Sequence, residues 1–264
     1  PSIRMLDQCR IGPILTGDRA DLGDGPPVNA MLIQNTNPAV VAPETNKVLQ
    51  GLRRNDLFFC VHEQFMTDTA LFADILLPAT TFVEHNDIYQ GGGHQHVMLG
   101  PRLVDPVGQS RSNHHVLCDL AKRLGTDHRG FDMTEEEIIN ETLLASGWGS
   151  LEQLRVNHWI DCQPSFEESH FLEGFAHKER RFRFAPNWSA EGPDYGQLPT
   201  LPDHIDLIEN ADNTHPFRLV TAPSHNYLNT SFTETATSIK KENRPTVKLC
   251  AEDAAAHNFQ DEDK

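Results

Sequence analysis

The stretch that decides the fold is VNAMLIQNTNPAVVAPETNKVLQGLRRNDLFFCVHEQFMTDTALFADILLPA, which is Val28–Ala79. Three short apolar runs, Ala30–Ile33, Leu57–Val61 and Ile75–Leu77, alternate here with segments that carry helical signals. Such alternation predicts parallel strands joined by crossover helices. We therefore expect an α/β fold with a parallel sheet in this part of the chain.

Polar residues gather where the first two predicted strands end. They are Asn35, Thr36 and Asn37 after the first strand, and His62, Glu63 and Gln64 after the second. In an open parallel sheet, ligands bind in the crevice outside the carboxyl ends of the strands. The two loops are therefore expected to lie side by side and to face the same ligand.

The two crossovers carry separate helical signals. Pro43 suits the first turn of a helix whose apolar side includes Val48 and Leu52. Thr67 or Asp68 can cap a shorter helix that ends before the third strand. The sheet and its crossovers should therefore be complete by Ala79.

Further elements are expected after the sheet. Glu84–His96 contains three consecutive glycines, which permit backbone conformations closed to other residues, and this predicts a loop. Helices are predicted over Ser112–Gly125 and Thr134–Gly147, the second of which opens with a capping box. A strand is predicted at Arg181–Phe184.

We expect the chain to divide into four parts. Residues 1–27 are dense in turn formers and predict an irregular entry segment, and residues 28–150 hold the α/β domain. Residues 151–213 are expected to be an irregular connecting region, and residues 214–264 the start of a second, β-rich domain.

The β-rich part rests on two predicted strands, Phe217–Ala222 and Thr246–Leu249, followed by a helical turn at Glu252–His257. So few strands cannot close a core, so we expect the sequence to be cut at this end.

Composition limits the classes of partner. The 264 residues are 38% hydrophobic and carry a formal net charge of −16, which argues against binding nucleic acid or an anionic membrane surface. No apolar run approaches the roughly 20 residues of a membrane span. Five scattered cysteines without C-x-x-C spacing do not indicate a zinc site, an iron–sulfur cluster or a disulfide framework, and they favour a cytoplasmic location.

Five segments, in order, make the chain resemble the molybdopterin oxidoreductases of the dimethyl sulfoxide reductase family. They are QNTNPAVVAPE (34–44), HEQFMTDTALFADILLPATTFVEH (62–85), RSNHHVLCDLAKRLG (111–125), LVTAPSHNYLNTSF (219–232) and PTVKLCAEDAAAHNF (245–259). GGGHQHVMLGPRLVDP (91–106) is similar to the biotin sulfoxide reductase or anaerobic dehydrogenase-like branch.

The resemblance implies a bis(molybdopterin guanine dinucleotide) cofactor with molybdenum or tungsten, which transfers oxygen atoms or electrons on a small-molecule substrate, with an electron-transfer protein as partner. It implies that residues 28–150 are part of the α/β domain that binds the dinucleotide, and that residues 214–264 start the C-terminal β-barrel. We expect a fragment that lacks the end of the barrel and the N-terminal part. That missing part would hold the metal's protein ligand and, in some members, an iron–sulfur cluster.

Cofactor-binding roles follow for the strand-end residues. The carboxylate of Glu63 offers two acceptors that match the adjacent N–H donors of guanine, with His62 and Gln64 beside it. Thr67 can donate to ribose or phosphate, and Asn35, Thr36 and Asn37 can turn amides toward a pyrophosphate. Without the resemblance, Glu63 is equally explained as a solvated loop carboxylate, and the Asn-Pro pair as a turn that caps a helix.

Two more regions carry candidate residues. By the resemblance, the cofactor-covering loop includes Thr221, Pro223, Ser224, Asn229, Thr230 and Ser231. A local turn is the alternative for Asn229 and Ser231. The loop around Gly92 is expected to approach the pterin or the substrate funnel, with His94 as a catalytic proton donor.

Two other functions stay open from the sequence. One is a nucleotide-binding or interaction module without catalysis. The other is a histidine-metal hydrolase, because the chain has 14 histidines, among them His85, His94, His96, His114 and His115. A paired i, i+2 histidine site would need a third ligand, and the sequence does not identify one.

Overall fold

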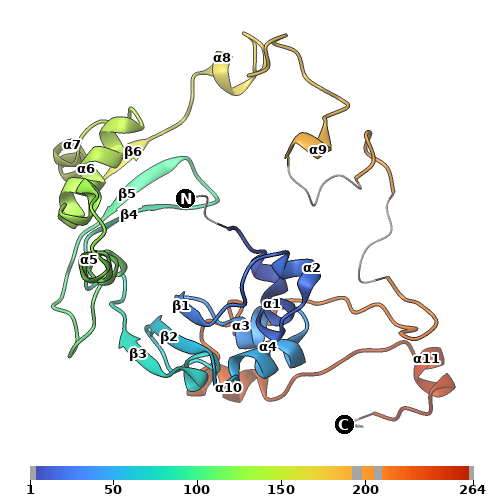
Figure 1. Cartoon of the computed structure of the whole chain (residues 1–264). Coiled ribbons are helices and arrows are strands. Elements are labelled where there is room, and N and C mark those ends of the chain that lie inside the picture. The colour runs from blue at the N-terminus through green and yellow to red at the C-terminus, as the bar shows by residue number, and fades with distance from the viewer. Residues whose placement is uncertain (1–3, 192–197, 205–209, 262–264) are drawn as a thin grey trace. The chain divides into compact units, whose positions relative to one another are not determined.

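The computed structural model describes residues 4–191, 198–204 and 210–261 (Figure 1). The chain divides into two compact units. The first contains residues 1–85, 104–127 and 223–264, and the second contains residues 86–103 and 128–222. Each unit has its own three-stranded sheet.

The sheet of the first unit is parallel, as the sequence predicts. It consists of β1 (Ala30–Gln34), β2 (Phe58–Glu63) and β3 (Ile75–Pro78), in the order β1-β2-β3. The register places Gln34 opposite His62 and Glu63 opposite Pro78. The three strands therefore end at the same edge, and the α/β class is confirmed.

Short helical segments connect these strands. Between β1 and β2 lie α3 (Pro38–Val41) and α4 (Thr45–Leu52), and the second of these is the helix predicted after Pro43. Between β2 and β3 the predicted short helix is a single 3₁₀ turn, η2 (Ala70–Phe72). It ends early because Asp74 binds the backbone N–H of Phe59 through its carboxylate, at 2.7 Å, and so returns the chain to the sheet.

The prediction of an irregular entry segment at residues 1–27 is wrong for its described part. Residues 4–27 contain η1 (Gln8–Arg10), α1 (Ile11–Thr16) and α2 (Arg19–Leu22). The turn formers terminate these helices: Gly17 ends α1 in the left-handed conformation, and Asp18 caps α2 by accepting a bond from Ala20.

Helix α1 packs against α4 through small residues. A Cβ built on Gly51 would lie 2.4 Å from the Cβ of Leu15, and one built on Gly12 would lie 2.9 Å from the backbone nitrogen of Val48. Leu15 and Val48 belong to a core that also contains Phe59 of β2. One face of the parallel sheet is thus covered by the helices before and after β1.

Gly51→Ala should destabilise the protein, because the new methyl group must push α1 away from α4. Overpacking of this kind costs about 1–3 kcal/mol of unfolding free energy. Thermal denaturation measures the effect, and Gly93→Ala is the matched control because a Cβ at Gly93 meets no atom within 4 Å. Equal melting temperatures for the two variants would contradict the close contact.

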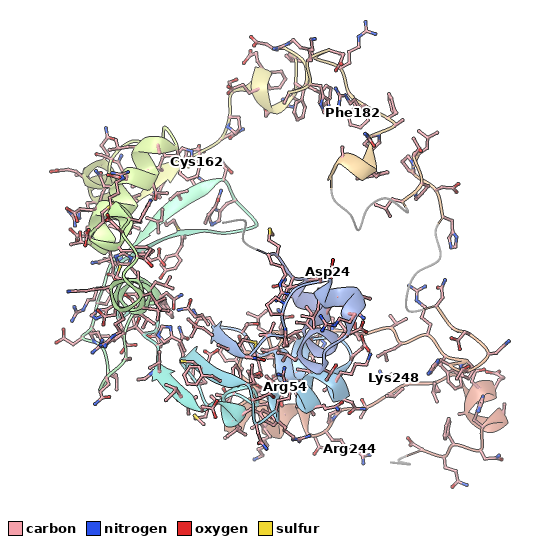
Figure 2. The ribbon with its side chains drawn as sticks, in the orientation of Figure 1. Asp24, Arg54, Cys162, Phe182, Arg244 and Lys248 are labelled. Atoms are coloured by element: carbon pink, nitrogen blue, oxygen red, sulfur yellow. The ribbon has the colours of Figure 1, made fainter. Side chains whose placement is uncertain are left out.

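Arg54 fastens the entry segment to the sheet (Figure 2). Its Nη1 donates to the carbonyl oxygens of Leu15, at 2.8 Å, and Val28, at 3.1 Å. Its Nε and Nη2 bind the carboxylate of Asp56 at 2.9 and 2.6 Å, and Nη2 also donates to Asn29. The Asp56 carboxylate raises the pKa of Arg54, so the guanidinium stays charged.

The second unit contains an antiparallel sheet of β4 (Asp87–Gln90), β5 (His96–Gly100) and β6 (Trp159–Asp161), in that order. Helices α6 (Glu135–Ala145) and α7 (Leu151–Asn157) share its apolar core. That core contains Val97, Ile139, Leu143, Leu151 and Leu154.

Part of the predicted loop at Glu84–His96 therefore forms strands: Asp87–Gln90 is β4 and His96 begins β5, while the glycine-rich residues 91–95 between them are a turn, as predicted. The alternation of half-buried and exposed residues in β5 around buried Val97 marks a strand with one face inward. In the sequence, the three glycines at residues 91–93 favour a loop and outweigh the strand pattern that follows them. Part of the region predicted as irregular, residues 151–161, forms α7 and β6.

The two helices predicted after the hairpin are confirmed. In the first unit, α5 (Asn113–Leu124) is capped by the side chain of Ser112 and ends at Gly125. In the second unit, α6 opens with the predicted capping box of Thr134 and Glu137. The short η3 (Arg129–Phe131) precedes α6.

The three remaining predicted strands are wrong. Arg181–Phe184, Phe217–Ala222 and Thr246–Leu249 have no strand pairing in the described part of the chain. The segments after α7 instead hold the short helices α8 (Phe166–Ser169), α9 (Trp188–Glu191), α10 (Ala236–Glu242) and α11 (Ala251–Ala256). An apolar β-branched run becomes a strand only when a partner strand satisfies its backbone groups, so residues 210–261 form no barrel here.

Across the described residues, helices long and apolar enough to cross a lipid bilayer are absent.

Candidate functional site

The two predicted polar loops lie at the same edge of the parallel sheet. The backbone N–H of Asn35 donates to the carbonyl oxygen of His62 at 3.2 Å, one step beyond the last strand pair. Asn35 adopts a left-handed conformation with φ of 51°. This turn directs the chain away from the sheet, so Asn35 and Thr36 are exposed while Asn37 turns inward.

Asn37 is buried, with 4% of its surface exposed. Its Oδ1 accepts bonds from the backbone nitrogen of Thr69, at 3.1 Å, and from the Thr69 hydroxyl, at 2.7 Å. The same hydroxyl oxygen accepts a bond from the backbone of Ala39 at 3.0 Å. Because a backbone N–H can only donate, the carboxamide must present its oxygen to Thr69.

This orientation leaves the Nδ2 of Asn37 as a buried donor without an acceptor among the described residues. A buried polar group that lacks a hydrogen bond costs free energy, so such groups are rare in native proteins. The Asn37 amide therefore fits an acceptor atom that this described part of the chain does not supply.

The second loop holds Glu63 and Gln64 at the end of β2. Oε1 of Glu63 accepts the backbone N–H of Gln64 at 2.7 Å, which orients a half-buried carboxylate. Gln64 donates from its side chain to the carbonyl oxygen of Thr80 at 3.0 Å. Glu63 keeps acceptor capacity, while the amide of Gln64 is already engaged with the protein.

The side chains of His62 and Thr67 make hydrogen bonds with other parts of the protein. His62 is fully buried, and its two ring nitrogens lie 3.1 Å from Nε2 of Gln34 and 3.0 Å from the carbonyl oxygen of Arg111. Thr67 is 8% exposed, and its hydroxyl oxygen accepts a bond from the backbone of Ala70 at 3.2 Å. Both side chains are buried and make hydrogen bonds near the carboxyl edge of the parallel sheet.

The start of α5 also lies at this edge, and the sequence did not reveal it. Arg111 pairs with the chain just after β3, donating to the Pro78 carbonyl at 3.0 Å and accepting from Thr80 at 3.2 Å. Nδ2 of Asn35 lies 3.5 Å from Oδ1 of Asn113. The Ser112 cap signal predicted where α5 begins in the sequence but not its place beside the sheet.

A buried carboxylate braces the loop that follows β3. Glu84 is 6% exposed and accepts bonds from the backbone N–H groups of Thr81 and Val107, both at 2.7 Å, and from the Thr81 hydroxyl at 2.9 Å. The Thr81 backbone bond, followed by that of Val107, lowers the pKa of Glu84 below 4.5.

This lowered pKa makes a pH-dependent contribution to stability. The ionised carboxylate stabilises the folded state above its unfolded pKa near 4.5, and the stabilisation is lost as pH falls through the lower folded pKa. Glu84→Gln should therefore lower the melting temperature by several degrees at pH 7, and the difference from wild type should narrow below pH 4. Melting curves across this range test it against Glu152→Gln, an exposed change on α7; a constant difference would contradict the role of ionised Glu84.

The predicted C-terminal loop is a local turn. Leu228 and Ser231 exchange backbone hydrogen bonds of 3.1 and 2.8 Å across Asn229 and Thr230, and Asn229 has φ of 52°. Ser224 precedes the turn, while Thr221 and Pro223 lie outside regular structure.

The turn is tied to α10 by Glu242. This carboxylate accepts the side-chain and backbone N–H groups of Asn226 at 2.7 and 2.6 Å, and these bonds lower its pKa. Of the residues predicted to cover the cofactor, those from Pro223 onward thus belong to the same compact unit as the parallel sheet, with the turn at Leu228–Ser231 close in sequence to the Asn226–Glu242 bonds.

His94 and Gly92 lie at the turn of the β4–β5 hairpin in the second unit. Nδ1 of His94 accepts the backbone N–H of His96 at 3.1 Å, and His96 packs edge-on against Trp159 with ring centroids 4.8 Å apart. Gly92 is exposed. Within the described ranges, three or more His, Cys, Asp or Glu side chains do not converge in a way that could hold a metal ion.

Several known proteins are similar to this chain in sequence or in fold. A family model described as Molybdopterin oxidoreductase matches residues 22–123. The Probable oxidoreductase YoaE of Bacillus subtilis is 34% identical over 249 residues, which cover 92% of this chain and 35% of that protein. The Trimethylamine-N-oxide reductase of Haemophilus influenzae is 26% identical over 267 residues, covering 90% of this chain and 32% of that protein.

A solved structure, the Acetylene Hydratase from Pelobacter acetylenicus, has a TM-score of 0.71 at 17% identity and covers 95% of this chain and 34% of its own. This similarity shows a shared fold. The chain spans about a third of the length of these relatives. With the family model lying over the parallel sheet and the start of α5, the chain belongs to the molybdopterin oxidoreductase family.

Proposed function

We propose that the chain is part of a molybdenum or tungsten oxidoreductase, and that the carboxyl edge of its parallel sheet binds the dinucleotide of a molybdopterin guanine dinucleotide. The observation that carries the proposal is the buried, oriented Nδ2 of Asn37, for which the described residues offer no acceptor. A phosphate or carbonyl oxygen of a nucleotide supplies such an acceptor.

The residues at this edge fit the polar half of such a cofactor. Asn37 donates from its buried amide, and the exposed Asn35 and Thr36 beside it can donate to pyrophosphate oxygens. Glu63 presents an oriented carboxylate that can accept the paired N–H donors of guanine. Bound, the cofactor supplies oxygen-atom or electron-transfer chemistry, while these residues bind and orient it.

The finer assignments rest on the family resemblance. We propose a second dinucleotide for the bis form, bound by the turn around Asn229–Ser231 with Thr221, Pro223 and Ser224, and His94 as a proton donor to a leaving oxide. The similarity to a protein named Trimethylamine-N-oxide reductase supports a small oxide as substrate class. Turnover of the full-length His94→Ala variant that is unchanged at every pH would remove the role of His94.

Metal and nucleotide analysis of the full-length protein tests the proposal. The cofactor is released with acid, and molybdenum, tungsten, zinc and GMP are measured. About two GMP per molybdenum or tungsten atom is the expected result, because the cofactor brings both metal and nucleotide. Zinc without GMP would indicate a histidine-metal hydrolase, and neither metal nor GMP would indicate a binding module without redox activity.

A further inference from the structure

His62 connects three elements at the carboxyl edge of the sheet. The carbonyl oxygen of Arg111 can only accept, so Nε2 of His62 must carry the proton in that 3.0 Å bond. Nδ1 then accepts from the amide of Gln34 at 3.1 Å. Both ring nitrogens are thereby engaged with protein atoms, and the hydrogen-bonding capacity of the ring is fully used.

The Arg111 carbonyl is the point where α5 joins the sheet. It receives the His62 ring N–H from β2 and the Thr80 backbone N–H from the chain after β3. The next residue, Ser112, caps α5 by accepting the backbone N–H of His115 at 3.3 Å. A line of hydrogen bonds therefore runs from Gln34 through His62 to the first turn of α5.

The position of this first turn matters for an anionic ligand. The N-terminus of a helix carries unpaired N–H groups and a partial positive charge, which favour phosphate. Here that end lies beside the loop that contains Asn35: Oδ1 of Asn113, the first residue of α5, is 3.5 Å from Nδ2 of Asn35. The buried Nδ2 of Asn37 in the same loop independently indicates an acceptor ligand at this edge.

We infer that His62 is a positioning residue for the dinucleotide: its imidazole ring holds the N-terminus of α5 against the carboxyl edge of the sheet. It acts through the Arg111 carbonyl and does not contact the ligand, because the ring is fully buried and both nitrogens are engaged. This inference rests on the proposed function.

Two substitutions of His62 separate the two bonds. In His62→Gln the terminal amide can take the place of Nε2 and donate to Arg111, while in His62→Asn the shorter amide can take the place of Nδ1 and meets only Gln34. Both variants keep a polar side chain in the same buried site. The two variants differ in whether the side chain at position 62 can donate a hydrogen bond to the Arg111 carbonyl oxygen.

The experiment uses the full-length holoenzyme with two readouts. Hydrogen exchange of the backbone amides at residues 113–116 should accelerate in His62→Asn and stay near wild type in His62→Gln. The rate of GMP-containing cofactor loss on dilution should rise roughly three- to tenfold in His62→Asn only, the effect of one lost hydrogen bond. Equal exchange and equal cofactor loss in the two variants would overturn the inference.

The outcomes distinguish this inference from the proposed function. If the wild-type protein contains no GMP, the proposed function fails, while the exchange data still decide whether His62 holds α5. If His62→Asn does not fold, Gln34→Met replaces it. Gln34→Met removes the donor that orients the ring, and it should accelerate exchange at residues 113–116; unchanged exchange and cofactor loss would then overturn the inference.

Discussion

Asn37→Asp is expected to leave the full-length protein with little or no bound molybdopterin dinucleotide. The aspartate keeps an oxygen for the two bonds from Thr69, so the local turn can be retained. Its second oxygen replaces the buried Nδ2 donor, and a buried carboxylate repels the phosphate that we propose there. The loss of GMP per protein should exceed tenfold, since a charge-assisted hydrogen bond becomes a repulsion.

Asn46→Asp is the matched control for this prediction, because it makes the same chemical change at an exposed position of α4. GMP and molybdenum or tungsten are measured in all three proteins after identical purification. Melting curves show whether Asn37→Asp is folded. A folded Asn37→Asp variant with a wild-type GMP content would show that the Asn37 amide does not bind the cofactor.

Arg54→Ala is expected to be the most destabilising of the surface-accessible substitutions. It removes the donors to the carbonyl oxygens of Leu15 and Val28 and leaves Asp56 without its partner. Lost hydrogen bonds to a charged group cost about 1.5–3 kcal/mol each and are not additive, so we expect about 3 kcal/mol in unfolding free energy. The melting temperature should fall by roughly 6–12 °C.

Arg53→Ala is the control. Arg53 is the exposed neighbour of Arg54, and its guanidinium lies over the ring of Phe72, 5.4 Å from the centroid. Such a contact is worth about 0.5–1 kcal/mol. Arg54→Lys should recover only part of the loss, because an ammonium group cannot reach Asp56 and two carbonyls as a planar fork does. Similar melting temperatures for Arg53→Ala and Arg54→Ala would contradict the proposed contribution of the Arg54 hydrogen bonds to stability.

The sequence predicts the parallel sheet well because each strand is a short apolar run with its own punctuation. The runs before Asn35 and His62 end in polar residues, and the structure places those ends together. Local patterns determine this edge, and the caps of α5 and α6 are equally local. Elements whose signals lie within about ten consecutive residues were therefore accessible without the structure.

Predictions failed where a long-range partner decides the structure. Helix α1, in the segment predicted to be irregular, packs on α4 in a contact that depends on Gly12 and Gly51 rather than on helix propensity. Phe217–Ala222 has strand propensity but no paired strand in the described part of the chain. Propensity alone does not form a strand, since its backbone groups need a neighbour.

The same distinction holds at the candidate site. Asn37, Glu63 and Gln64 could be predicted from the sequence because Glu63 and Gln64 lie at the end of β2 and Asn37 lies in the short loop after β1. The role of Arg111 and the enclosure of His62 were not, since both depend on a contact across 49 residues of sequence. A histidine next to a residue that is predicted to bind the cofactor is easily taken for a cofactor-binding residue itself. The contacts of both ring nitrogens of His62 with protein atoms are the basis for our inference that it supports the carboxyl edge of the sheet.

The hydrogen bonds of Arg54 to the entry segment have a consequence for how this domain can be inherited. Because one side chain holds Leu15, Val28 and Asn29 together, the entry helices and the sheet form one unit of recombination. A gene exchange with its junction at residue 27 would pair helices from one parent with a sheet from another. Such a chimaera loses these bonds unless both parents present the same carbonyl positions to Arg54, so we expect it to be less stable than either parent.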